Sequence, residues 1–257
     1  MVYLLLAALA AAPILAIGAG LETAEPAASD PYAAPISELR NRDPKAARQA
    51  EDSLVKAGPA AIPALVRVLH KAAIREPYWA AIGRMGPKAL PALLDLTLDE
   101  ELRNTAGDAL YHVAGPGWAP QIPALLECMK RIEIKNYCGL ALTKAMSPKG
   151  AVQLPLLVQA LKSEDASVRA FSAAAIGMAK GSAASAVPAL IEALKDPSSM
   201  VRMGAAKGLG MMGRKARPAV LALQAMSSAD PDGEVRRTAM EALKSIRGYV
   251  AGQAFWD

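Results

Sequence analysis

The sequence predicts an all-α solenoid, a right-handed superhelix of about seven helical hairpins preceded by one hydrophobic helix. Two observations predict this fold. A tetrapeptide pattern recurs at intervals of 28 to 33 residues, and 53% of the residues are hydrophobic while only 4% are aromatic. Ala, Leu and Met, which are strong helix formers, therefore supply the core, and too few aromatic residues remain to fill a large mixed α/β core. The composition excludes a β-sandwich, a coiled coil and a disulfide-dense mini-domain. The 257-residue length alone allows one or two compact domains or an elongated array, and the repeat favours the array.

The recurring tetrapeptide consists of an apolar residue, Pro, a small or apolar residue and Leu. Its copies are Ile62–Leu65, Leu90–Leu93, Ile122–Leu125, Leu154–Leu157 and Val187–Leu190, with a degraded sixth copy predicted at Arg217–Val220. Proline in the first turn of a helix costs little, because the missing N–H would have no acceptor within the helix. Each copy therefore predicts the start of one helix, which we call helix A.

A second helix, B, is predicted after each helix A. One basic residue follows each proline at a distance of 12 to 18 residues: Arg75, Arg103, Lys135, Arg169, Arg202 and Arg236. Asp165 and Asp232 each lie three residues before a valine and are natural N-caps. Small residues follow, and a glycine closes many copies, which predicts C-caps at Gly58, Gly86, Gly115, Gly181 and Gly213. An earlier unit, from Pro35 to Gly58, is the predicted first repeat.

These patterns recur in a constant order, and in this they resemble HEAT repeats of the short PBS-lyase-like, or bilin-lyase-type, variety. The resemblance covers residues 36–248 in about seven units. Repeats 1 and 7 depart most from the pattern, as capping units do. Repeat 4 has Ile134-Lys135 where Val-Arg is typical, so this unit keeps only the charge of the basic position. The resemblance implies a scaffold for binding other proteins and supplies no catalytic residues.

The first twenty residues carry no charge and predict a membrane segment. Residues 2–20 would span about 28 Å as a helix, close to the thickness of a bilayer core. A retained single-pass transmembrane anchor fits this length. A cleaved signal peptide is the alternative, because small residues near Gly18 and Gly20 resemble a cleavage site, although no Lys or Arg precedes the apolar run.

Residues 21–35 are predicted to be a Pro/Ala-rich linker, since Pro26, Pro31 and Pro35 prevent a continuous helix. The acidic residues after the apolar run and the absence of a nearby Lys or Arg favour the solenoid lying outside the cytoplasm, on the periplasmic side. If residues 1–20 are cleaved, the protein is exported.

The net charge of +5 is unevenly distributed: residues 21–52 carry −3, and the remainder therefore carries +8. The basic excess is spread among acidic residues rather than concentrated in one block, which favours a solvated surface. No nucleic acid is expected as a partner, because no aromatic residues are interleaved with the basic ones. A cationic face that binds anionic lipid or another polyanion remains an alternative.

The six regularly spaced basic residues allow two interpretations. Stacked repeats would place them in a ladder, and they could pair internally with aspartates or helix ends, because buried charge must be paired. Alternatively, the series forms a cationic stripe that binds an acidic protein partner. Both interpretations stay open at the level of sequence.

Cys128 and Cys138 occupy positions that are mostly apolar in the other repeats, one on each helix of repeat 4. They could be buried free thiols. They could also form a disulfide, if the domain lies outside the cytoplasm and the Cα atoms lie within about 7 Å.

The C-terminal tail, residues 249–257, breaks the repeat and contains Phe255 and Trp256. It is predicted to cap the last hydrophobic face. The alternative is a docking peptide, because aromatic residues often anchor interfaces.

No catalytic, cofactor-binding or metal-binding constellation is predicted. Gly208–Gly213 matches G-x-G-x-x-G, but it lacks the preceding strand of a dinucleotide site, so close helix packing and a C-cap explain it better. Asp230–Glu234 resembles the start of a calcium loop without the later ligands. His70 and His112 have no Cys or carboxylate at ligand spacing.

The leading functional hypothesis is a non-enzymatic scaffold for protein–protein interaction, membrane-tethered or exported, such as an accessory subunit of a larger membrane complex. Its partners would be one or more membrane-associated proteins, and it would need no cofactor. The alternatives are a bilin-lyase-like chromophore attachment factor, which rests only on the resemblance, and a binder of anionic lipid or polyanion.

Overall fold

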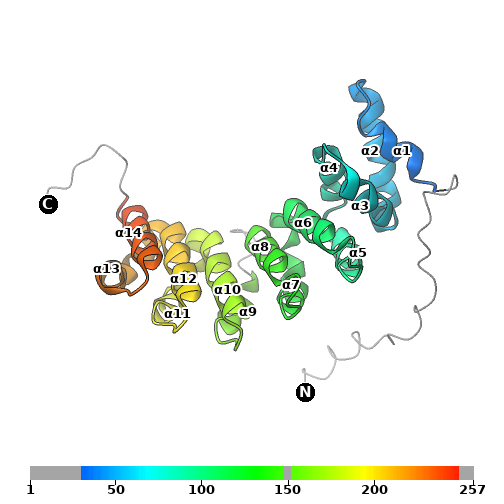
Figure 1. Cartoon of the computed structure of the whole chain (residues 1–257). Coiled ribbons are helices and arrows are strands. Elements are labelled where there is room, and N and C mark those ends of the chain that lie inside the picture. Colours follow the sequence, from blue (N-terminus) through cyan, green and yellow to red (C-terminus); the bar gives the residue numbers. More distant parts are fainter. Residues whose placement is uncertain (1–29, 147–151, 249–257) are drawn as a thin grey trace, which may run out of the picture.

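A computed structural model describes residues 30–146 and 152–248, which form seven antiparallel helical hairpins in an elongated arc (Figure 1). The A helices are α1 (Ala33–Glu38), α3 (Ile62–Lys71), α5 (Leu90–Leu96), α7 (Ile122–Cys128), α9 (Leu154–Ala160), α11 (Val187–Ala193) and α13 (Val220–Ala229). The B helices are α2 (Pro44–Ala57), α4 (Glu76–Met85), α6 (Arg103–Val113), α8 (Lys135–Ala145), α10 (Ala166–Met178), α12 (Ser199–Met212) and α14 (Gly233–Arg247). The predicted all-α repeat fold is confirmed for these residues.

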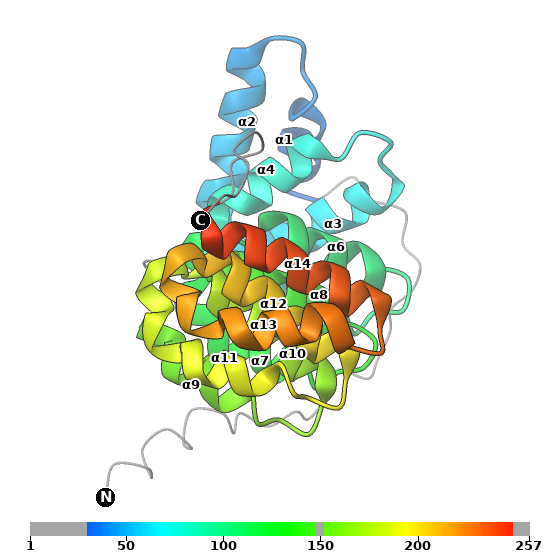
Figure 2. The same cartoon turned by 90° about the vertical axis from the view of Figure 1, so that its left-hand side faces the viewer.

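The two kinds of helix form two layers. Each B helix contacts the B helix of the next repeat, from α2 to α14, so the B helices make a continuous row. In Figure 1 this row lines the inner, concave side of the arc, and α5, α7, α9, α11 and α13 lie on the outer side. Figure 2, a view from the α14 end, shows the same two layers and the first hairpin projecting beyond them.

Short 3-10 segments make five of the connections from a B helix to the next A helix, along one edge of the array. They are η1 (Gly58–Ala61), η2 (Gly86–Ala89), η3 (Pro116–Gln121), η5 (Lys180–Ala186) and η6 (Gly213–Ala219). The prolines of the tetrapeptides lie at the first or second position of α3, α5, α7, α9 and α11, as predicted. Asp165 and Asp232 cap α10 and α14 by accepting hydrogen bonds from two backbone N–H groups each, which confirms both predicted N-caps.

The predicted position of the sixth tetrapeptide was wrong. Pro218 lies inside η6, and the last A helix begins at Val220. The equivalent tetrapeptide is therefore Val220–Leu223, whose Leu223 is buried like the last leucine of every other copy. In this register Leu221 takes the place of the proline. The spacing from this position to the basic residue of helix B becomes similar to that in the preceding two repeats.

Two of the five predicted glycine C-caps were also wrong. Gly58, Gly86 and Gly213 end their helices with positive φ angles of 68°, 67° and 56°, which glycine adopts at low cost. Gly115 is extended instead, with a φ of −164°. In the fifth repeat Lys180, rather than Gly181, has a positive φ, of 51°. Lys180 thus occupies the position that Gly213 occupies in the next repeat, since each lies seven residues before the first residue of helix A.

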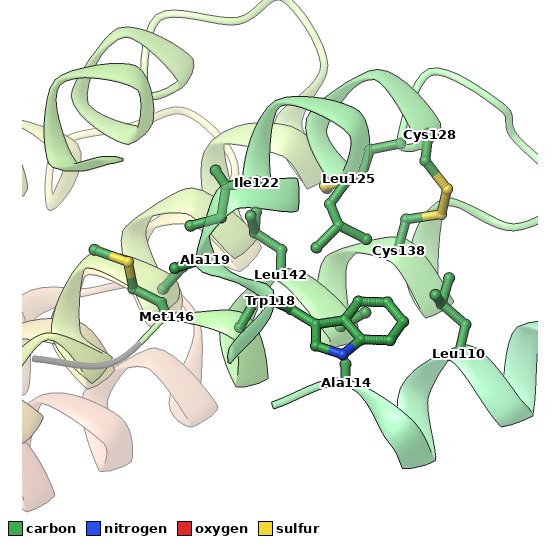
Figure 3. Close-up of a cluster of buried hydrophobic side chains, with 14 of the residues drawn as sticks. Leu110, Ala114, Trp118, Ala119, Ile122, Leu125, Cys128, Cys138, Leu142 and Met146 are labelled. Carbon is green, nitrogen blue, oxygen red and sulfur yellow. A yellow bond between two sulfur atoms is a disulfide. The ribbon is translucent and has the colours of Figure 1, made fainter. Parts of the chain in front are cut away.

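The core is a row of aliphatic side chains between the two layers, and repeat 4 illustrates it (Figure 3). Leu125 and Leu142 are fully buried, and Trp118 fills the space beneath the 3-10 segment η3 with an exposure of 2%. Cys128 and Cys138 are buried beside them and joined in a disulfide, with Cα atoms 6.0 Å apart. The disulfide links α7 to α8 within one hairpin.

Glycine and alanine allow α10 and α12 to pack with their backbones in contact. A Cβ atom on Gly204 would lie 2.5 Å from the carbonyl oxygen of Ala170, and one on Gly177 would lie 2.4 Å from the Cα atom of Gly208. No side chain larger than hydrogen fits at these positions. The G-x-G-x-x-G pattern is therefore explained by close packing at Gly208 and a C-cap at Gly213, as predicted.

The predicted membrane segment and linker, residues 1–20 and most of 21–35, lie outside the described residues, and so does the tail, residues 249–257. Within residues 30–146 and 152–248, no helix combines the length and the apolar character that crossing a bilayer requires.

Candidate partner-binding surface

The basic series forms a ladder of hydrogen bonds along the edge where A helices connect to B helices. Arg169 and Arg202 each bind the next repeat through two nitrogen atoms: Arg169 contacts Asp196 at 2.8 and 2.9 Å, and Arg202 contacts Asp230 at 2.7 and 2.8 Å. The Nη1 atoms of Arg169, Arg202 and Arg236 each donate to two backbone carbonyls five and six residues earlier. Each guanidinium group therefore binds the backbone just before its own helix B. The guanidinium groups of Arg169 and Arg202 also bind the next repeat.

The ladder is weaker in the N-terminal repeats. The Nζ atom of Lys135 lies 3.6 Å from Asp165, and Arg75 lies 3.4 Å from Asp108. Arg103 donates to the carbonyl of Thr97 at 3.2 Å. These B helices begin at or beside the basic residue, whereas α10, α12 and α14 begin three residues earlier. The additional turn positions the arginines of the last three repeats over two carbonyls at once.

The paired side chains influence each other's ionisation. The hydrogen bonds from Arg169 lower the pKa of Asp196, and those from Arg202 lower the pKa of Asp230, although burial opposes both shifts. The same pairs raise the pKa of the two arginines. The side chains of Arg202 and Asp230 are only 12% and 7% exposed, so solvent screens this pair little.

The structure thus brings the basic series into the internal ladder, one of the two arrangements that the sequence allows. The guanidinium groups of Arg169 and Arg202 face aspartates of the same chain rather than open solvent. A role of Arg75, Arg103, Lys135, Arg169, Arg202 and Arg236 in binding a partner remains a prediction. Phe255 and Trp256 lie outside the described residues.

A cluster of aromatic side chains lies on the B helices of repeats 2 to 4. The rings of Trp79 on α4 and His112 on α6 are stacked with centroids 3.7 Å apart, and Tyr111 meets His112 edge to face at 5.1 Å. The ammonium group of Lys144 on α8 lies 4.6 Å from the centre of the Tyr111 ring. We call Trp79, Tyr111, His112 and Lys144 the aromatic cluster.

Hydrogen bonds hold the aromatic cluster in place. Lys144 donates to the backbone carbonyls of Tyr111 and His112 at 2.6 and 3.1 Å, and burial lowers its pKa. Asp108 lies 3.6 Å from Nε2 of His112. The cluster therefore joins three consecutive B helices and is organised before any partner arrives.

Two further aromatic side chains continue along the row of B helices. Tyr137 on α8 lies over Gly107 of α6, and Phe171 on α10 lies over Gly139 of α8, each so close that a Cβ atom would collide with the ring. Both side chains are half-buried. Aromatic groups thus follow the concave row from α4 to α10.

Sequence reasoning missed this row, although a signal was present. The chain has only eleven Phe, Trp and Tyr residues. Tyr137 and Phe171 both lie two residues after the basic residue of their repeat, and Trp79 lies four residues after Arg75. Because B helices expose a constant face, a scarce residue type at these offsets could have indicated a surface.

The described residues hold no group of three or more His, Cys, Asp or Glu side chains that could bind a metal ion. Among the histidines, His70 contacts the hydroxyl of Thr105 at 2.8 Å, and His112 belongs to the aromatic cluster. Asp230 and Asp232, which suggested a calcium loop, are used in the ladder and in the cap of α14.

Comparison with known proteins gives one family. Residues 154–247, which form α9 to α14, match the family described as HEAT repeats. No curated protein matches the chain in sequence.

Several solved structures are similar to this chain at low sequence identity. A crystal structure of an engineered protein is 19% identical, with 84% of this chain and 96% of that chain covered and a TM-score of 0.47. The complex of CpcE and CpcF of phycocyanin lyase from Nostoc sp. PCC7120 is 20% identical, with 60% and 97% covered and a TM-score of 0.46. Human deoxyhypusine hydroxylase is 21% identical, with 85% and 96% covered and a TM-score of 0.36. The match of residues 154–247 to HEAT repeats supports the predicted resemblance.

Proposed function

We propose that this chain is a non-enzymatic scaffold that binds a protein partner on the concave row of B helices, with the aromatic cluster at the centre of the contact. The observation that supports this proposal is the stack of Trp79 on His112, with Tyr111 and Lys144 beside it, on the surface of three adjacent helices. Trp and Tyr are enriched among the residues that dominate binding energy at protein interfaces.

The aromatic cluster favours binding because its side chains and the backbone beneath them are already ordered. A solenoid presents an extended surface that is already formed, and each ring in the cluster is fixed by a neighbour from another repeat. Side chains that are held before binding lose less conformational entropy when a partner docks. The partner that fits is a protein segment with apolar side chains for the rings and an acceptor for the positively charged Lys144.

The test compares proteins that co-purify with the full-length chain and with two variants. Trp79→Ala combined with Tyr111→Ala should release the specific partner, because truncating such anchors costs about 2 kcal/mol or more, roughly 30-fold in affinity. Trp79→Phe should retain most of the binding, since Nε1 of Trp79 has no hydrogen-bond partner among the described residues. Leu156→Ala, on the outer helix α9, is the matched control.

Two results would contradict the proposal. The chain could purify alone under gentle solubilisation, or the same proteins could co-purify with wild type and with the double variant. Circular dichroism of the double variant separates lost binding from lost folding.

The cellular location belongs to the same proposal. We infer from residues 1–20 and the linker that the scaffold is held at a membrane on its outer side, or exported, as an accessory subunit of a larger complex. Membrane fractionation with N-terminal sequencing of the mature protein tests this part separately. The alternative, chromophore attachment, rests on the sequence resemblance alone.

A further inference from the structure

The edge that connects B helices to A helices is strongly basic in the last three repeats. Between Asp196 and Asp230 the sequence has five basic residues and no acidic residue. One of them, Arg202, is used in the ladder. Arg214, Lys215 and Arg217 lie exposed on the 3-10 segment η6, and Lys180 lies exposed at the start of the adjacent segment η5.

These cations lie together and are not neutralised within the described part of the chain. The segments η5 and η6 contact each other, and the side chain of Lys215 lies beside Gly181. Among the described residues, none forms an ion pair with Lys180, Arg214, Lys215 or Arg217. In the same repeats Asp165, Asp196, Asp230 and Asp232 cap B helices or pair with the ladder at the opposite edge. Glu192, Glu234 and Glu241 form ion pairs with Lys195 or Arg237.

Helix dipoles do not explain these cations. The C-terminus of a B helix has a partial negative charge, but the following A helix begins at the same edge with a partial positive charge. The two contributions oppose each other along this edge. Four uncompensated cations therefore create a local positive potential that the fold itself does not require.

Two residues on this edge also depart from the pattern of most other repeats. Lys180 takes a left-handed backbone conformation, which glycine adopts at lower cost, as at Gly213. Leu221 takes the place of the proline and is 80% exposed. Neither residue gains a core contact from its position. Local rules that are broken without a structural gain commonly mark functional surfaces.

We propose that this basic edge binds the surface of an anionic lipid bilayer, with Lys180, Arg214, Lys215 and Arg217 near the headgroups and Leu221 inserted between them. We call these five residues the basic edge. An exposed edge with four cations and one exposed apolar side chain fits the anionic, apolar-cored surface of a bilayer. The four aspartates of the ladder and the caps lie at the opposite edge, so the electrostatic field favours orienting the basic edge toward the bilayer.

The experiment measures binding of the full-length chain to vesicles of phosphatidylcholine and to vesicles in which part of the phosphatidylcholine is replaced by phosphatidylserine. The neutral vesicles report any insertion of residues 1–20, so the measured quantity is the additional affinity for anionic vesicles. This additional affinity should decrease as salt rises, because salt screens exposed charges beyond about 10 Å at 0.1 M.

The decisive variant is Arg214→Gln/Lys215→Gln/Arg217→Gln. It should reduce the additional affinity about 100-fold, since each cation near an anionic surface contributes about fivefold. The matched control, Arg67→Gln/Lys71→Gln/Lys162→Gln, removes the same charge from exposed residues elsewhere and should bind like wild type.

A second variant tests the apolar contact. Leu221→Pro restores the residue type of the other repeats and should weaken binding to anionic vesicles about tenfold without loss of helix content. Leu221→Ala gives the same information if the proline variant does not fold.

Three outcomes would overturn the proposal. The chain could bind neutral and anionic vesicles equally, or both charge variants could lose the same affinity. The third is salt-sensitive binding of soluble polyglutamate with no preference for anionic vesicles, which would indicate an acidic protein partner. Loss of the partner in the aromatic-cluster variants would leave these vesicle results unchanged, so the two proposals fail separately.

Discussion

Arg202 and Asp230 join the sixth and seventh hairpins through two hydrogen bonds, of 2.7 Å from Nε and 2.8 Å from Nη2. The pair is largely buried, and Arg202 also donates to two carbonyls of its own turn. Asp230→Asn should therefore lower the free energy of unfolding by about 2 kcal/mol, the range of hydrogen bonds to charged groups. Denaturant titration measures this. Glu192→Gln, which removes an exposed pair with Lys195, is the control and should change little. Equal losses in the two variants would contradict the importance of the ladder.

The ladder also predicts a dependence of stability on pH. Arg169 and Arg202 lower the pKa values of Asp196 and Asp230 in the folded protein, so the unfolded chain binds more protons in acid. The stabilisation is complete above the unfolded aspartate pKa of about 3.9 and is lost as the pH falls through the lower folded value. Unfolding curves between pH 2 and pH 7 should show this loss in wild type. The double variant Asp196→Asn/Asp230→Asn should show a shallower acid dependence, and an unchanged slope would contradict the assignment.

The backbone contact between α10 and α12 predicts an unusual response to alanine. In an exposed helix, Gly→Ala normally stabilises by about 1 kcal/mol. At Gly204 the new methyl group would lie 2.5 Å from the carbonyl oxygen of Ala170, and the two helices would have to separate. We expect Gly204→Ala to destabilise the protein by about 1–3 kcal/mol. Gly117→Ala, where no atom lies within 4 Å of the added carbon, should be tolerated. If Gly204→Ala raised the thermal stability, the backbones of α10 and α12 would not be in close contact at this position.

Lys180 predicts a stabilising substitution. Its φ of 51° is unfavourable for any residue with a Cβ atom, and Lys180→Gly should raise the free energy of unfolding by about 1 kcal/mol. The reverse change, Gly213→Ala, should lower it by a similar amount, because Gly213 has a φ of 56°. If both changes left the stability unaltered, the left-handed conformation would not be maintained in solution.

The disulfide between Cys128 and Cys138 can be checked by thiol alkylation of the unfolded chain followed by mass spectrometry. We expect no alkylation without reductant and two modified cysteines with it. Reduction should lower the stability by about 2–3 kcal/mol in the loop-entropy estimate for a separation of 10 residues. Two modified cysteines in both samples would show that the thiols are free in the isolated protein.

Repetition made much of the fold predictable. Each apolar-Pro pair indicates a helix start, and Asp165 and Asp232 cap helices because an aspartate before a valine-containing turn can accept backbone N–H groups locally. The sixth tetrapeptide misled the prediction, since Pro218 offers the same local signal within a 3-10 segment. Only the burial of Leu223 identifies the true register.

The candidate surface was harder to predict, because its contacts join different repeats. Trp79 and His112 are 33 residues apart in the chain, and their stacking depends on how the superhelix places α4 against α6. A local sequence pattern does not determine how two neighbouring B helices are oriented relative to each other. The internal role of Arg169 and Arg202 was one of two interpretations that spacing allowed, and choosing between them required the positions of Asp196 and Asp230.

The Arg–Asp pairs with two hydrogen bonds lie in the last repeats, and so does the backbone contact between α10 and α12. Lys135 and Arg75, in earlier repeats, make longer single contacts. A force applied along the arc would therefore strain its two halves unequally. The hairpins before α9 should stretch and recoil first, while α10, α12 and α14 move together as a stiff block. The repeats that carry the aromatic cluster should therefore deform more easily than the repeats that carry the basic edge.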